Sequence, residues 1–372
     1  MFEDIPLIYM SIKTLKFWSL IYDRSWRRLV CLSMTTFMVL TQFSYIFQTD
    51  EGIQAIIRNA YCTVLWFNTI FRAYMLLLHG ERYQNLIALM VKYYNELRQS
   101  KDMYIKHLLD EADGNGKIMV RGNLFLGLLT SIGFGCYPLF ANERVLPFGS
   151  MIPGINELKT PFYQFWYVYQ MTMTPIGCCM YIPYTSLVVG LIMFGIVMCK
   201  SLQYRLKTLK NIEYNSHQSI QNSVIECIKY QNRIIRYIEV INQLTTYVFL
   251  IEFLAFGTLL CALLFLLIII DSTAQTVIVC AYISMTFAQI LALYWYANEL
   301  REQNLAVAAA AYETDWFLFD TSTQKYILLI IMRAQRPSTI KVGDNYPMTL
   351  ELFQSLLNAS YTYFTLLKRV YG

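Results

Sequence analysis

Long uncharged stretches alternate along this chain with segments in which the charged residues are concentrated. Six stretches are almost wholly free of Asp, Glu, Lys and Arg, and only Arg72 and Glu252 interrupt them. They are residues 29–49, 59–80, 122–142, 160–199, 240–270 and 272–298. A seventh apolar stretch, 347–372, ends the chain. A helix of about 20 apolar residues crosses a bilayer. The pattern therefore predicts an all-α, polytopic membrane protein with seven transmembrane helices.

The last stretch carries polar residues at regular intervals of three or four positions. They are Glu351, Gln354, Asn358, Thr362, Thr365 and Arg369. At 3.6 residues per turn these positions form one stripe along a helix. Polar groups are costly against lipid, so the stripe should face protein or water. We expect this helix to form part of the wall of a pore.

The distribution of basic residues predicts how the helices are oriented. Charged residues make up only 15% of the chain, whereas hydrophobic residues make up 56%. Of the 30 Lys and Arg residues, 25 fall in the N-terminal segment and in every second connection with its flanks, Arg72 included. Basic residues are enriched in cytoplasmic loops. The N-terminus should therefore be cytoplasmic and the C-terminus extracellular, which is the reverse of a G-protein-coupled receptor.

Apolar positions also recur in the cytoplasmic connections. Ile220, Val224, Cys227, Gln231, Ile234, Ile238 and Ile241 form a near-heptad seam. This seam and segment 305–335 predict extended cytoplasmic helices, whose apolar faces are buried either within one chain or between subunits. We favour an intersubunit anchor. The expected organisation is a cytoplasmic segment 1–28, helices 1–4 in 29–199, an anchor connection 200–245, helices 5–6 in 246–298, an anchor segment 299–345 and a pore-lining helix 346–372.

Aromatic, sulfur and hydroxyl side chains share faces in the outer halves of spans 2, 3, 4 and 6. The candidate ligand-binding residues are Tyr61, Leu65, Trp66, Thr130, Gly133, Tyr137, Phe165, Tyr169, Met173, Val279, Tyr282 and Thr286. Together they would line an aromatic-rich cavity suited to a small volatile molecule. The alternative is ordinary packing between helices.

The sequence contains no enzyme signature and implies no cofactor. His79, His107 and His217 have no metal-ligand spacing, and the nine cysteines suggest neither a zinc site nor a disulfide framework. The net charge of +5 follows from the cytoplasmic loops and implies no nucleic-acid partner. For Glu252 we expect snorkelling toward the inner interface or a structural hydrogen bond, and for Arg72 the same.

The C-terminal sequence Ser360-Tyr361-Thr362-Tyr363-Phe364-Thr365-Leu366-Leu367, after Met348-Thr349-Leu350-Glu351-Leu352-Phe353, resembles the last helix of insect odorant receptors. Length, seven spans and inverted orientation agree with that family along the whole chain. The related gustatory receptors place Gln-Phe after their final Thr-Tyr. Here Arg369-Val370 stands at that offset, and this chain departs from the gustatory pattern.

The resemblance implies an odorant-specific subunit of a ligand-gated, non-selective cation channel in the plasma membrane of sensory neurons. Such subunits assemble as heterotetramers with a shared co-receptor, whose long insertion between spans 4 and 5 is absent here. The permeant ions would be monovalent and divalent cations. Aligning Tyr363-Phe364 with the family motif places a hydrophobic gate at Leu366, with Val370 one turn further out. Lys368 and Arg369 disfavour cations, so the partner should supply most of the pore.

Two other functions remain open from the sequence. One is a metabotropic-type or gustatory-like chemoreceptor that signals through a cytoplasmic partner. The other is a secondary transporter, although no internal repeat or pair of broken helices is visible.

Overall fold

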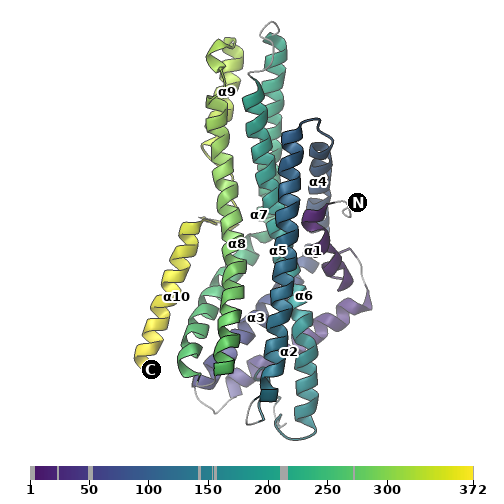
Figure 1. The fold of residues 1–372 in the computed structure, drawn as a ribbon, viewed down its shortest axis with the longest axis vertical. Helices are drawn as coiled ribbons and strands as arrows, with labels where there is room; N and C mark the ends of the chain where they lie inside the picture. The colour runs from purple at the N-terminus through teal and green to yellow at the C-terminus, as the bar shows by residue number, and fades with distance from the viewer. Residues whose placement is uncertain are drawn as a thin grey trace.

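The computed structural model describes residues 5–22, 25–48, 53–140, 144–152, 154, 157–209, 217–270 and 273–371, and this part of the chain is almost wholly helical (Figure 1). Its α-helices are α1 (Pro6–Phe17), α2 (Trp26–Gln48), α3 (Ile53–Leu78), α4 (Gly80–Arg98), α5 (Met103–Cys136), α6 (Phe162–Thr208), α7 (His217–Ile269), α8 (Thr273–Tyr312), α9 (Thr321–Ala334) and α10 (Leu350–Tyr371). Short 3-10 turns η1 (Tyr137–Phe140) and η3 (Trp316–Leu318) and two-residue strands β1 (Lys341–Val342) and β2 (Tyr346–Pro347) complete the described elements. The prediction of an all-α protein is confirmed.

Among the described residues, each predicted span lies mainly in one helix. Among the described residues, five helices are long and apolar enough to cross a membrane, namely α2, α5, α6, α7 and α8. Within α3, a shorter apolar helix runs over Cys62–Leu78. The stripe of polar residues on α10 explains why this 22-residue helix is less apolar than α2, α3, α5, α6, α7 and α8.

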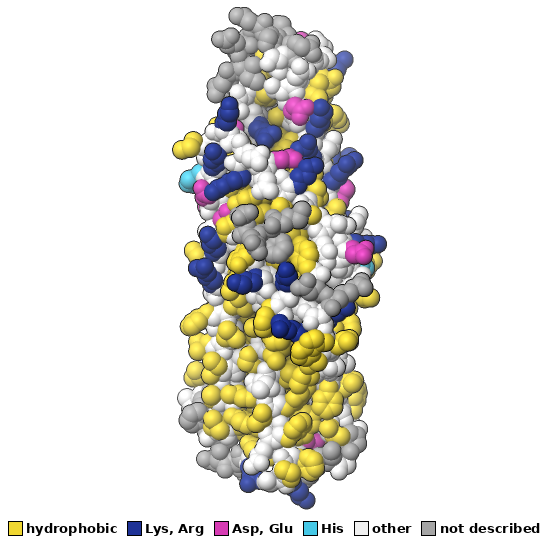
Figure 2. Space-filling model, turned by 90° about the vertical axis from the view of Figure 1, so that its right-hand side faces the viewer, with side chains coloured by type: hydrophobic (Ala, Val, Ile, Leu, Met, Phe, Trp, Pro, Cys, Tyr) yellow, Lys and Arg dark blue, Asp and Glu magenta, His cyan; other side chains and the backbone are white. Residues whose placement is uncertain are grey.

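Charged side chains are concentrated toward one end of the elongated molecule, and apolar side chains cover most of the surface toward the other end. Figure 2 shows Lys and Arg gathered over one part of the surface and hydrophobic side chains covering the other. We name these parts the charged half, which includes α4 and α9, and the apolar half, which includes α2 and α10 (Figure 1). Large exposed apolar side chains of the apolar half include Leu40, Phe47, Leu129 and Val168. Soluble monomers rarely expose contiguous apolar surface of this kind, and a bilayer would cover it.

Helix α6 is the central element. Every residue from Met180 to Cys199 is buried, and α6 contacts α5, α8, α1 and α7. Helix α1 packs on it at Gly190, where an added Cβ would lie 3.3 Å from the Leu7 carbonyl oxygen and 3.1 Å from Ile8. The N-terminal segment therefore contributes a buried helix to the core, a feature that the sequence did not reveal.

The near-heptad seam of α7 is buried inside the chain. All seven of its residues are buried, and the Gln231 side-chain amide donates to the Ile330 carbonyl on α9 at 3.2 Å. Our expectation that this seam joins subunits is therefore wrong for these residues, because α7 uses them to pack within its own chain. Exposed apolar side chains in the charged half include Leu328, Leu329 and Met332 on α9.

A short hairpin leads into α10. Strands β1 and β2 pair antiparallel, with Lys341 opposite Pro347. The Asn242 side chain on α7 accepts from the Lys341 amide and donates to the Thr339 carbonyl, at 3.0 and 2.7 Å. The start of α10 is therefore fixed to α7.

A buried carboxylate on α5 fastens α1 to the bundle. Asp113 accepts from the Leu7 amide at 3.2 Å and from the Tyr94 hydroxyl at 2.6 Å. Asp113→Ala would leave both donors buried and unpaired, at a cost of about 1–3 kcal/mol. We expect a melting temperature several degrees lower in detergent, measured by fluorescence-detected size exclusion.

Asp110→Ala is the matched control for this change. Asp110 pairs with Arg98 on the surface, and an exposed pair of this kind contributes about 0–1 kcal/mol. Equal melting temperatures for the two variants would show that Asp113 does not hold α1.

Candidate functional site

Helix α10 presents two chemically different faces. Phe353, Leu356 and Ser360 are buried, and the Ser360 hydroxyl is 3.3 Å from the Gly257 carbonyl oxygen on α7. Gly257 permits this approach, since a Cβ there would lie 3.1 Å from Leu356. The other face carries the polar stripe, and its members Glu351, Gln354, Asn358, Thr362, Thr365 and Arg369 are all exposed. Leu366 is 61% exposed beside the far end of the stripe, and the side chain of Val370 lies outside the described residues.

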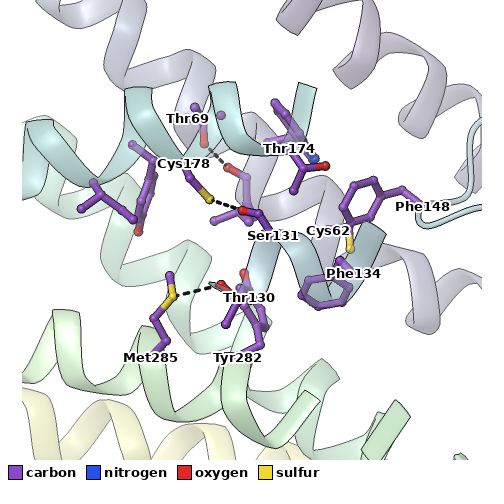
Figure 3. Close-up of a pocket in the computed structure, with 15 residues that line it drawn as sticks. Cys62, Thr69, Thr130, Ser131, Phe134, Phe148, Thr174, Cys178, Tyr282 and Met285 are labelled. Carbon is purple, nitrogen blue, oxygen red and sulfur yellow. Dashed lines mark hydrogen bonds between the residues drawn. The ribbon is translucent and has the colours of Figure 1, made fainter. Parts of the chain in front are cut away.

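A small cavity lies in the apolar half between α3, α5, α6 and α8 (Figure 3). Its volume is about 50 Å³. Its lining residues are Cys62, Leu65, Trp66, Thr69, Thr130, Ser131, Phe134, Phe148, Thr174, Gly177, Cys178, Tyr181, Ile182, Tyr282 and Met285. An apolar cavity of about 150 Å³ holds benzene. A ligand of that size or larger must therefore displace side chains from this wall.

Aromatic rings form much of the wall. The Trp66 ring lies against Gly177 of α6, where an added Cβ would come within 2.7 Å of the ring. Glycine at this position is what lets the indole fill the space between α3 and α6. On the opposite side, Phe134 meets Tyr282 edge to face, with ring centroids 5.6 Å apart. Such walls bind apolar ligands through dispersion and ring contacts.

The hydroxyl groups of the wall are bonded mainly within their own helices. Thr69 and Thr174 donate to carbonyls four residues earlier, at 2.9 and 2.7 Å. Ser131 donates to the Gly127 carbonyl at 2.7 Å and lies 2.9 Å from the Cys178 sulfur (Figure 3). These serine and threonine hydroxyls are thereby satisfied without water, and the cavity remains predominantly apolar. In the described part of the chain, no group of three His, Cys, Asp or Glu side chains is placed to hold a metal ion.

One loop residue closes part of the cavity. Phe148 is buried, and its ring centroid is 5.9 Å from that of Phe134. The Gln170 side chain on α6 holds the loop, because it accepts from the Phe148 amide at 3.0 Å and donates to the Phe148 carbonyl at 2.9 Å. The Gly149 amide donates to Asn59 on α3, also at 3.0 Å.

The structure brings some of the sequence-predicted ligand residues together and separates others. Leu65, Trp66, Thr130 and Tyr282 line the cavity. Gly133, Tyr169, Met173, Val279 and Thr286 are partly or fully buried nearby but do not line it, and Phe165 is 62% exposed. The side chains of Tyr61 and Tyr137 lie outside the described residues.

The residues missed on α6 continue a predicted stripe toward the middle of the molecule. Phe165, Tyr169 and Met173 are four residues apart, and the same spacing reaches Gly177 and Tyr181, which line the cavity. The periodicity identified the correct face of the helix but set the depth two turns too far out.

The two intramembrane charges pair with each other. Arg72 on α3 and Glu252 on α7 form an ion pair in which both side chains are almost fully buried. Of the two expected alternatives, snorkelling is wrong for both residues, because neither side chain reaches the surface. The other alternative, a structural hydrogen bond, is present at Arg72, which donates to the Thr185 hydroxyl at 2.5 Å.

Comparison with known proteins gives concordant results. The family model described as "7tm Odorant receptor" matches residues 52–361. The chain is 43% identical to Odorant receptor 30a of Drosophila melanogaster, covering 99% of this chain and 98% of that one. It is 42% identical to Odorant receptor 10 of Aedes albopictus, with the same coverage of both chains. Both relatives are individually named odorant receptors rather than the shared co-receptor.

The fold also matches a solved structure. The olfactory receptor OR5 of Machilis hrabei is a seven-helix membrane protein that was solved in complex with eugenol. This chain superposes on it with a TM-score of 0.83 at 16% sequence identity. The match covers 98% of this chain and 97% of that one. The family model and the full-length relatives agree that this is a receptor chain and not an enzyme. The chain belongs to the insect odorant receptor family, among its odorant-specific members.

Proposed function

We propose that this chain is the odorant-binding subunit of a ligand-gated, non-selective cation channel. A small volatile molecule binds in the cavity between α3, α5, α6 and α8, and α10 lines a pore shared with the co-receptor in a heterotetramer. The channel lies in the plasma membrane of sensory neurons. The observation that carries this proposal is the exposed polar stripe of α10, which lies in the apolar half of the molecule.

The stripe supports a pore because lipid is a poor environment for it. Hydroxyl, amide and charged groups at membrane depth are costly unless they face water or protein. Thr362 and Thr365 donate to carbonyls of their own helix, and the charged groups of Glu351 and Arg369 need a more polar surrounding. Copies of this face around a central axis would enclose water, and the apolar side chain of Leu366 would form the constriction.

The composition of the cavity wall supports the proposal that the ligand is small and apolar. Its wall combines rings from Trp66, Phe134, Phe148 and Tyr282 with a few hydroxyls that are already bonded. Eugenol, bound by the Machilis receptor of similar fold, is a small aromatic volatile. A ligand opens the channel only by binding the open arrangement more tightly than the closed one. Because the cavity is small, the ligand would bind more tightly to an arrangement in which the cavity wall has expanded. This expansion would provide the difference in affinity between the open and closed arrangements.

The charged half is proposed to lie in the cytoplasm, with the N-terminus inside and the C-terminus outside. The concentration of Lys and Arg there follows the rule for cytoplasmic segments. Exposed apolar side chains on α9 would then contact neighbouring subunits and form the anchor of the assembly.

Current recordings from cells that express this chain with and without the co-receptor test the proposal. A panel of small volatiles that includes eugenol would be applied while nucleotides are dialysed out of the cell. We expect a cation current within milliseconds that needs the co-receptor. A response that disappears with the nucleotides would indicate signalling through a cytoplasmic partner instead.

Leu366→Ala should raise the current in the absence of odorant several-fold, because a smaller side chain widens and wets the constriction. Leu40→Ala on α2 is the matched control, since both leucines are 61% exposed. Whole-cell current normalised to surface expression is the measurement. Equal basal currents in the two variants would place the gate elsewhere.

Tyr282→Ala should raise the half-maximal concentration of an activating volatile by about tenfold or more, which corresponds to about 1.4 kcal/mol of lost interaction. Tyr282 is 3% exposed and contributes a ring to the wall. Tyr247→Ala, at a tyrosine that is 56% exposed on α7, should leave the dose–response curve unchanged. Coincident curves for all three proteins would show that the ligand binds outside this cavity.

Leu329→Asp should weaken assembly with the co-receptor, because a charge replaces an apolar side chain that is 52% exposed on α9. Thr321→Asp, also at an exposed position on that helix, is the control. Co-purification of tagged subunits measures the effect. If both variants recover the co-receptor equally, α9 is not part of the anchor.

A further inference from the structure

The ion pair between Arg72 and Glu252 stands between the cavity and the helix that carries the polar stripe. Both residues interrupt stretches that otherwise lack charge, and they are 2% and 5% exposed. Ionised side chains at membrane depth are costly, and a structural role alone could be filled by apolar residues that pack equally well. The position of the ion pair in the fold indicates which role it has beyond a structural one.

On one side, Arg72 contacts the wall of the cavity. Its guanidinium lies over the Tyr181 ring, 4.0 Å from the centroid. Arg72 Nη1 donates to the Thr185 hydroxyl at 2.5 Å and to the Tyr181 carbonyl at 3.4 Å. Tyr181 lines the cavity, and so does Thr69, which is one turn before Arg72 on α3. A shift of Tyr181 therefore acts on Arg72 through both its ring and its backbone.

On the other side, Glu252 lies on the helix that supports α10. One turn later on α7, Phe256 stacks on Phe353 of α10, with centroids 6.4 Å apart. Tyr294 of α8 contacts the same ring at 5.3 Å. Glu252 borders the same small space as Phe256, Tyr294 and Leu356 of α10. Movement of Glu252 is thus transmitted to residues that hold the buried face of α10.

Two observations favour an ion pair that can be separated by a ligand. The cavity holds about 50 Å³, so a bound molecule must push lining residues such as Tyr181 aside. In addition, Arg72 Nε and Glu252 Oε2 make no hydrogen bond within the described part of the chain. Glu252 is therefore held mainly by Arg72, whereas Arg72 is also held by Thr185 and Tyr181 of α6. If Arg72 moves together with Tyr181, the Glu252 carboxylate loses its partner.

We propose that the Arg72–Glu252 ion pair is a latch that couples the cavity to α10. Intact, it joins α3 to α7 and holds the contracted cavity and the resting position of α10 together. A ligand that displaces Tyr181 moves Arg72 away from Glu252, and α7 then releases α10. The inference rests on the proposed function and names how its binding site controls its pore. Both residues act through others and are positioning residues.

The test measures basal and odorant-evoked current, normalised to surface biotinylation, in cells that also express the co-receptor. The probe is the volatile that gives the largest current with the wild-type chain in a panel that includes eugenol. The substitution Glu252→Gln weakens the latch, because it removes the negative charge while the side-chain volume stays nearly the same. We expect a several-fold higher basal current, a half-maximal concentration at least three-fold lower and a slower decay after washout.

Glu313→Gln is the matched control, because Glu313 pairs with Lys207 on the surface. It should leave all three quantities unchanged. Where Glu252→Gln does not reach the surface, the double variant Arg72→Met/Glu252→Met, which leaves no unpaired charge, should show the same gain. Tyr181→Leu should raise the half-maximal concentration in the wild-type chain and have less effect in the Glu252→Gln background, a dependence that a merely structural pair would not produce.

The outcomes separate the latch from the proposed function. If the wild-type chain responds and the Glu252 variants match Glu313→Gln, the latch is overturned and the odorant-gated channel stands. Loss of both basal and evoked current at normal surface level also overturns the latch, because the pair would then be needed for opening. If the wild-type chain with the co-receptor gives no current to any volatile, the proposed function itself fails.

Discussion

The burial of α6 on all sides is the constraint on which the other features depend. From Met180 to Cys199 every side chain contacts protein, so α1, α5, α7 and α8 must all pack around one axis. That arrangement leaves α2 and α10 on the periphery and places the cavity where α3, α5 and α8 meet α6. It also explains how two charges persist at membrane depth, since Arg72 and Glu252 face each other beside α6 rather than lipid.

Much of this arrangement could be predicted from the sequence because it depends on local periodicity. Uncharged stretches located the membrane-crossing helices, and the spacing of Glu351, Asn358 and Thr362 identified the exposed face of α10. What could not be predicted depends on contacts between distant residues. The pairing of Arg72 with Glu252 joins helices 180 residues apart, and α1 packs on Gly190 although its own segment shows only a modest apolar pattern.

The candidate cavity was predicted less well than the helices that form it. Periodicity indicates which face of a helix turns inward, and the predicted residues Trp66, Thr130 and Tyr282 do line this cavity. The position of the cavity along the helix axis depends on how neighbouring helices are shifted relative to one another. The sequence of a single helix does not contain this information. Phe148 could not be found in this way at all, because its position in the wall is set by Gln170, which lies 22 residues later in the chain.

The small volume of the cavity has a consequence for how such a receptor reports a changing stimulus. When a site must expand before a ligand can enter, the apparent affinity for the ligand is reduced. The factor equals the fraction of ligand-free molecules in which the site is already expanded. The loss appears in the apparent association rate, because a ligand meets an expanded site less often, and it is the same factor for all ligands that need the same expansion. A receptor with a contracted resting site thus responds less sensitively to a rising stimulus and keeps its discrimination among such ligands.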